Sequence, residues 1–179
     1  FLDLNVANMR DRAELILTGR LKEAGFYKVS PKSFYEIVSD EILKGCLPSN
    51  SLLVVHQDTY SYQGSDPVIE SQMPYILFLE KVQLDTKTAP SNMVCYQVIK
   101  TWKGIIPLDN KAQERRPFIY IKRNYGIDIT GKLKAFEQAL KYSIDRYEKQ
   151  LSGPKEFLSP EAYVIYKELK LGGARGGSP

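Results

Sequence analysis

Residues Ser30–Gly45 read Ser-Pro-Lys-Ser-Phe-Tyr-Glu-Ile-Val-Ser-Asp-Glu-Ile-Leu-Lys-Gly, and their conformation decides the fold. A serine followed by Pro31 is typical of a helix start, and Gly45 is a typical helix stop. The run Phe-Tyr-Glu-Ile-Val is instead aromatic and β-branched, with Tyr35 and Ile37 at the alternation of a strand. The local signals favour a helix slightly, so the neighbouring segments must decide.

Short apolar runs typical of strands lie on both sides of this stretch. They are Ala13–Leu21, with a bulge or bend at Gly19, and then Leu52–His56, Tyr75–Val82, Val94–Thr101 and Phe118–Ile121. Between the first run and the deciding stretch, Lys22–Lys32 is predicted to be a loop or the wide end of a hairpin, because it contains Gly25 and Pro31.

Two helices are predicted after these strands. Apolar residues recur every three or four positions from Leu133 to Leu151, and Gly153-Pro154 ends that helix. Ser159-Pro160 opens a second, shorter helix. We therefore expect a domain over residues 1–153, a second helix within 154–171 and a flexible glycine-rich tail over 172–179.

Several short motifs resemble a known class. They are AELILTGR at Ala13–Arg20, EILKG at Glu41–Gly45, LLVV at Leu52–Val55, PYILFLE at Pro74–Glu80 and WKG at Trp102–Gly104. Together they resemble bacterial envelope or secreted domains similar to the tissue-inhibitor-of-metalloproteinase (TIMP-like) and netrin-like class. The resemblance implies an OB-type five-stranded barrel, in which the deciding stretch is a long strand. The metalloproteinase inhibitors place an N-terminal cysteine on the protease zinc, whereas this chain begins Phe1-Leu2-Asp3, so inhibition is not implied.

The predicted fold class is thus α+β: a five-stranded OB-like antiparallel β-barrel with C-terminal helices packed on it. Ser33–Leu43 is predicted as mostly strand. A bulge near Ser39–Asp40 is needed to bring Ile42 or Leu43 back to the core face.

Composition excludes some classes of function. The net charge of +4 over 179 residues is too small to imply a nucleic-acid partner. No apolar run approaches the roughly 20 residues of a membrane-spanning helix, so no transmembrane segment is predicted. The resemblance implies an extracellular or cell-envelope location with a leader removed before Phe1, and the cytoplasm is the alternative.

Few residues offer chemistry. Cys46 and Cys95 allow one disulfide or two free thiols. His56 is the only histidine, so a small hydrolase would need it, with Cys95 as the nucleophile. One histidine and two separated cysteines leave a zinc site incomplete, and no phosphate loop is present. We expect no metal site, no cofactor and no catalytic residue.

Two stretches are candidates for ligand binding. The first is the polar loop with Tyr60 and Tyr62. The second is the basic and aromatic stretch Lys111–Tyr125, with Arg115, Arg116, Tyr120, Lys122, Arg123 and Tyr125, which suits single-stranded nucleic acid on an OB-type barrel. We expect a non-enzymatic binding domain for an unknown protein partner or small ligand. A single-stranded nucleic-acid binder is the alternative, and the hydrolase is a third.

Overall fold

The computed structural model describes residues 5–29, 32–57, 69–83, 94–99, 104–109, 131–149 and 157–176. The chain forms two compact units. Ala13–Leu108 contains the strands, and Phe1–Arg12 with Asp109–Pro179 contains the helices. The division lies at Ala13 and Asp109, whereas the sequence analysis grouped residues 1–153.

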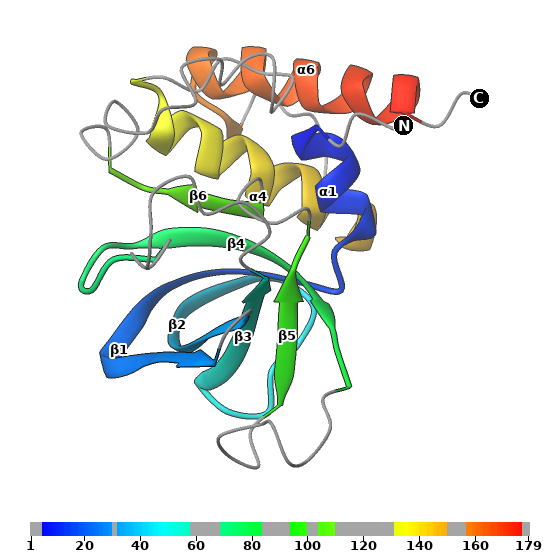
Figure 1. Cartoon of the computed structure of the whole chain (residues 1–179). Coiled ribbons are helices and arrows are strands. Elements are labelled where there is room, and N and C mark those ends of the chain that lie inside the picture. The colour runs from blue at the N-terminus through cyan, green and yellow to red at the C-terminus, as the bar shows by residue number, and fades with distance from the viewer. Residues whose placement is uncertain are drawn as a thin grey trace. The chain divides into compact units, whose positions relative to one another are not determined.

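The strand unit is a closed five-stranded barrel with one extra strand (Figure 1). Its strands are β1 (Leu15–Val29), β2 (Lys32–Lys44), β3 (Ser51–Gln57), β4 (Tyr75–Lys81), β5 (Cys95–Val98) and the extra β6 (Ile105–Pro107). The order is β1-β2-β3-β5-β4-β6, and a β1–β4 pairing closes the barrel. All pairings are antiparallel except that of β3 with β5, so the barrel is mixed. The α+β barrel expected from the sequence is confirmed.

The deciding stretch is a strand, because β2 pairs with β1 on one edge and with β3 on the other. These two ladders satisfy its backbone groups, which outweighs the helix-capping signals. The expected bulge is present: Thr18 pairs with Glu41 and Gly19 with Ser39, which leaves Asp40 as an extra residue. After the bulge Leu43 is 5% exposed and Ile42 is 39% exposed, so Leu43 is the residue that returns to the core.

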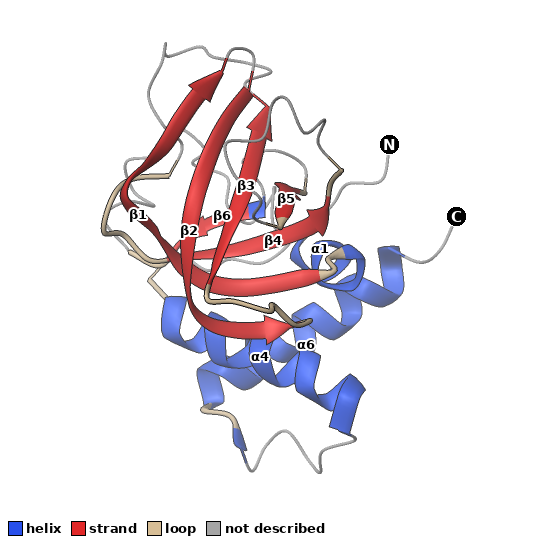
Figure 2. Cartoon of the chain, turned by 90° about the horizontal axis from the view of Figure 1, so that it is seen from below, coloured by secondary structure: helices blue, strands red, loops and turns tan. Residues whose placement is uncertain are grey.

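Strand β1 is longer than the sequence suggested. It pairs with β4 only over Leu15–Gly19, but it continues along β2 as far as Val29. Of the two alternatives predicted for Lys22–Lys32, the loop is wrong, because pairing with β2 resumes at Phe26, and the end of a hairpin is what the structure shows. Figure 2 shows β1, β2 and β3 side by side as three long strands.

Apolar side chains fill the inside of the barrel. The core residues are Leu15, Leu17, Tyr35, Ile37, Leu52, Val54, Ile69, Tyr75, Leu77, Leu79, Tyr96, Val98 and Ile105. They come from alternate positions of the strands, as expected where one face of each strand points inward. Because the interior is packed with side chains, binding must use the outer surface or an end of this barrel.

The helix unit contains α1 (Val6–Arg12), α4 (Leu133–Lys149) and α6 (Pro160–Gly176) among the described residues. Helix α6 contacts both α4 and α1. Ser159 caps α6, since its hydroxyl accepts the Ala162 N–H at 3.2 Å. Tyr142 of α4 packs edge-on against Tyr166 of α6, with ring centroids 5.4 Å apart. Both predicted helices are present, and α6 continues to Gly176, beyond the expected start of the tail.

Candidate functional site

All eight residues predicted from the sequence as ligand-binding lie outside the described part of the structure. These residues are Tyr60, Tyr62, Arg115, Arg116, Tyr120, Lys122, Arg123 and Tyr125. The expected strand over Phe118–Ile121 also falls there. His56 belongs to β3, but its side chain is outside the described set. The roles assigned to these residues remain predictions.

The two cysteines are free thiols in the structure, with Cys46 exposed and Cys95 buried. Cys95 packs with Phe34, Leu53 and Val55, whereas the next residue, Tyr96, belongs to the barrel core. Successive strand residues point to opposite faces, so Cys95 faces away from the barrel interior. The disulfide that the sequence allowed is therefore not formed. The Cys95 thiol lies in an apolar cluster, which is a poor setting for a nucleophile.

A bulge in β1 creates the most irregular described surface of the barrel. Leu21 pairs with Ile37 and Phe26 with Tyr35, so the four residues 22–25 face Glu36 alone. At Gly25 a β-carbon would lie 2.8 Å from the Lys22 carbonyl oxygen, so this position of the bulge excludes a side chain. Bulges of this kind redirect side chains and often lie beside binding sites.

Ion pairs cross from β1 to β2 at this bulge. Arg20 Nε lies 3.3 Å from Asp40 Oδ2, and Lys22 Nζ lies 3.0 Å from Glu36 Oε1. The cations are on β1 and the carboxylates on β2. Both cationic side chains are about half exposed, so each pair contributes only about 0–1 kcal/mol to stability. The pairs therefore shape the surface charge more than they hold the fold.

Two non-glycine residues beside these pairs have left-handed backbones. Ala24 has φ 55° and Gln72 has φ 65°. Ser71 bridges to Leu21, and the Gln72 carbonyl accepts a hydrogen bond from Arg20 Nη1 at 3.1 Å. Gln72 thus lies beside Arg20 and Leu21 of β1, the strand that also contains Ala24. We call Arg20, Lys22, Ala24, Glu36, Asp40 and Gln72 the bulge surface.

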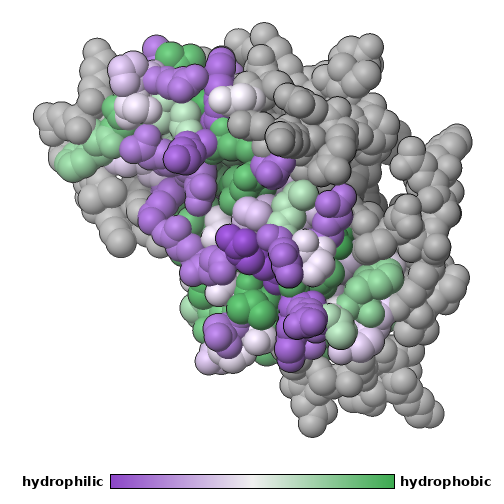
Figure 3. Space-filling view, turned by 90° about the vertical axis from the view of Figure 1, so that its left-hand side faces the viewer, coloured by the Kyte–Doolittle hydropathy of each residue, from purple (hydrophilic) through white to green (hydrophobic). Residues whose placement is uncertain are grey.

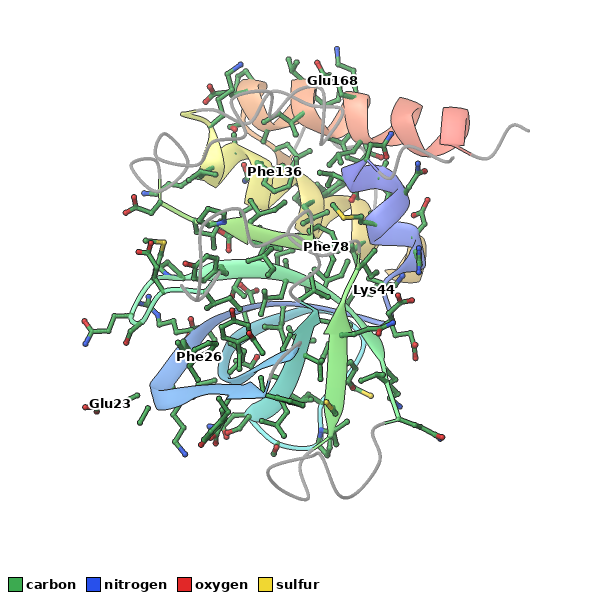
Figure 4. All side chains as sticks on the ribbon, in the orientation of Figure 1. Glu23, Phe26, Lys44, Phe78, Phe136 and Glu168 are labelled. Carbon is green, nitrogen blue, oxygen red and sulfur yellow. The ribbon has the colours of Figure 1, made fainter. Side chains whose placement is uncertain are left out.

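The figures show the character of this region. In Figure 4 the Glu23 side chain, next to Ala24, points away from the barrel. In Figure 3 hydrophilic side chains gather over the described barrel surface with apolar ones between them. A mixed polar and apolar surface of this kind is ordinary for protein–protein contacts.

A second group of polar residues lies where β1 begins. Glu14 Oε1 accepts the Lys81 N–H at 3.2 Å, and Lys81 pairs with Tyr96 across β4 and β5. Gly45, which follows β2, has φ 83°, and a β-carbon there would collide with the Glu14 carbonyl oxygen. The sheet register thus brings Glu14, Cys46 and Tyr96 to one end of the barrel, which we call the Glu14 end. Figure 4 places Lys44 on the opposite side of the barrel from Glu23.

The Tyr96 phenol has a perturbed acidity. Burial raises its pKa above the ordinary value of 10.0, and the negative charges of Cys46 and Glu14 raise the pKa further. Tyr96 is only 2% exposed. The Tyr96 hydroxyl therefore keeps its proton to a higher pH than an exposed phenol does. Nothing in the local sequence indicates this group, since its members are separated by more than 30 positions.

Among the described residues, no three His, Cys, Asp or Glu side chains are grouped closely enough to hold a metal ion. Within the same residues, no helix combines the length and apolarity needed to cross a membrane.

No protein-family model matches the chain, and no curated protein matches it.

Proposed function

We propose that this protein is a non-enzymatic binding domain of the cell envelope or extracellular space, and that it binds a protein partner through the bulge surface. The observation that carries the proposal is the presence of two exposed left-handed residues, Ala24 on β1 and Gln72, whose carbonyl is bound by Arg20 of the same strand. A left-handed backbone costs a residue with a β-carbon roughly 1–2 kcal/mol. Such conformations concentrate at binding and switch sites, where the geometry has a use. The location rests on the resemblance to netrin-like exported domains.

The charges of this region favour a protein over a nucleic acid. Strands β1 and β2 together carry five Lys or Arg and four Asp or Glu. Two of the cations are already paired with carboxylates of the neighbouring strand. A nucleic-acid site needs an excess of cations along the phosphate track, whereas alternating charges fix the register of a protein partner.

A charge-swap variant tests the bulge surface. Lys22→Glu combined with Glu36→Lys keeps an ion pair at this position but reverses its direction. Immobilised wild-type protein is used to capture partners from the envelope and secreted fractions of the source organism, and the captured partner is then purified. We expect the dissociation constant of the complex between this partner and the swap variant, measured by calorimetry, to be at least tenfold higher than that with wild-type protein. The reason is that charges of the partner would then face like charges on the variant.

Glu168→Lys on α6 is the matched control, since Glu168 is exposed and lies outside the barrel unit. It should leave the dissociation constant unchanged. Equal affinity of wild-type and swap proteins would remove the bulge surface from the interaction. A partner found only in cytosolic extract would overturn the location but not the binding role.

The nucleic-acid alternative rests on Lys111–Tyr125, outside the described residues. It requires an affinity for oligo-dT that falls steeply between about 50 and 200 mM salt, through counterion release. We expect no binding even at low salt, and a salt-dependent affinity lost in Arg115→Gln/Arg116→Gln would replace our proposal. The hydrolase alternative is tested by ester turnover, which would have to disappear in His56→Ala.

A further inference from the structure

Residues 69–74 lie beside β1 at the point where β1 and β4 stop pairing. That ladder ends at Tyr75, the first residue of β4. Just before β4 the chain turns, and Ser71 forms a parallel bridge with Leu21 of β1. Ile69 is fully buried and belongs to the barrel core, although it precedes β4. This segment therefore covers the core at one end of the barrel, and we call residues 69–74 the strap.

Two side chains of the barrel hold the strap, one from inside and one from outside. The hydroxyl of Tyr75, a core residue, accepts the Glu70 N–H at 2.9 Å. The Arg20 guanidinium donates from Nη1 to the Gln72 carbonyl oxygen at 3.1 Å. The Arg20 side chain is 51% exposed, so a partner on the bulge surface can reach the guanidinium that holds the strap.

Opposing contributions act on the strap. Gln72 has φ 65°, a conformation that residues with a β-carbon rarely adopt, so opening relieves strain there. Closing makes the hydrogen bonds of Glu70 and Gln72 to the barrel. A segment balanced in this way can open locally while the rest of the barrel stays folded. A guanidinium also binds a carboxylate more strongly than a neutral carbonyl, so a carboxylate of a partner competes with Gln72 for Arg20.

From the hydrogen bond between Arg20 and the Gln72 carbonyl, we infer that Arg20 holds the strap closed and that a partner carboxylate which binds Arg20 releases it. Release uncovers apolar side chains at this end of the barrel, among them Ile69 and Leu21, which the partner then buries. Release by a partner rests on the proposed function, because it needs a partner at the bulge surface. The closure by Arg20 is a property of the protein alone.

The first test is hydrogen exchange of backbone amides, followed by NMR in the free protein. In wild type the Glu70 amide should exchange at least tenfold faster than the Leu53 amide, which is bonded within the sheet. Low urea should leave the Glu70 rate unchanged, because local opening exposes little surface. Arg20→Gln should speed Glu70 exchange at least threefold. Lys22→Gln is the matched control and should not change it, because opening breaks the Arg20 contact but not the ion pair of Lys22 with β2.

Tyr75→Phe tests the link between opening and binding. The variant lacks the hydroxyl that accepts the Glu70 N–H, so the strap should open more often, and Tyr75 is buried away from the bulge surface. The dissociation constant of the captured partner should fall at least threefold, because the binding-competent open state is then more populated. An unchanged dissociation constant would overturn release of the strap by the partner.

The inference and the proposed function can fail separately. A Glu70 amide that exchanges as slowly as Leu53, or at the same rate in Arg20→Gln as in wild type, would overturn the closure by Arg20 even if the bulge surface binds a partner. Failure to capture any partner would remove the proposed function and release by a partner with it. Faster Glu70 exchange in Arg20→Gln would still support the closure by Arg20.

Discussion

Replacing Ala24 by glycine should make the protein more stable. Ala24 has φ 55°, a conformation that costs an alanine about 1–2 kcal/mol and a glycine almost nothing. Glycine loses roughly 0.5–1 kcal/mol more backbone entropy on folding than alanine. The methyl group of Ala24 is exposed, so its removal sacrifices little packing. The balance is a gain of about 0.5–1 kcal/mol in the free energy of unfolding.

The assay is urea unfolding followed by circular dichroism, with thermal melting as a second measurement. For a chain of this size the gain corresponds to a melting temperature about 1–4 °C higher. Gly25→Ala is the matched control in the same bulge. A β-carbon there would lie 2.8 Å from the Lys22 carbonyl and 3.0 Å from that of Glu36, so stability should fall by about 1–3 kcal/mol.

A neutral or destabilising Ala24→Gly would refute the reasoning. It would mean that the bulge holds no strain at Ala24. The observation that carries the proposed function would then be lost, even if the control behaved as expected.

Three further predictions follow from the barrel and its flanks. Gly45→Ala should lower the free energy of unfolding by about 2–5 kcal/mol in the same urea assay, because it adds a collision with a backbone carbonyl to the strain of φ 83°. Gly131→Ala, at φ 71° with nothing within 4 Å, should lower it by only about 1–2 kcal/mol. The folded pKa of Tyr96 is raised, so the unfolded chain loses this proton first as pH rises above 10.0; stability should then fall by up to about 1.4 kcal/mol per pH unit, and Tyr96→Phe should lack this part of the decline. Native protein should titrate one thiol, that of Cys46, and the Cys95 thiol should react only after denaturation; a native protein with no reactive thiol would contradict the free cysteines.

The sequence predicted the barrel because the strand patterns of the surrounding segments outweighed the helix-capping signals within residues 30–45. Residues 30–45 carry helix caps, but the apolar runs around them require strand partners. The bulge at Asp40 also followed from the sequence, because an extra residue there returns Leu43 to the core face of β2. The register shift lies opposite Gly19, where a β-carbon would lie 2.8 Å from the Val38 carbonyl oxygen.

The second half of β1 was missed for a physical reason. Gly25 signals a loop, but here it lies inside a bulge, after which pairing with β2 resumes at Phe26. The bulge surface was missed with it. A left-handed alanine has no signature in a single sequence, because the surrounding ladder imposes the conformation.

The Glu14 end could not be predicted from any single segment of the sequence either. Cys46 was identified only as a thiol, and neither Glu14 nor Tyr96 belongs to any motif. Their proximity comes from strand register, namely the pairing of Lys81 with Tyr96 and the contact of Gly45 with Glu14. Register of this kind is a property of the whole barrel rather than of one segment.

The central claim is that the left-handed conformation of Ala24 serves binding. The most direct test is the dissociation constant of the captured partner for wild-type protein and for Ala24→Gly, measured by calorimetry on the same preparations used for unfolding. The account predicts opposite signs: the variant is more stable and binds at least threefold more weakly, because the bulge is no longer held in its binding conformation. A variant that is more stable and binds as tightly as wild type would contradict it.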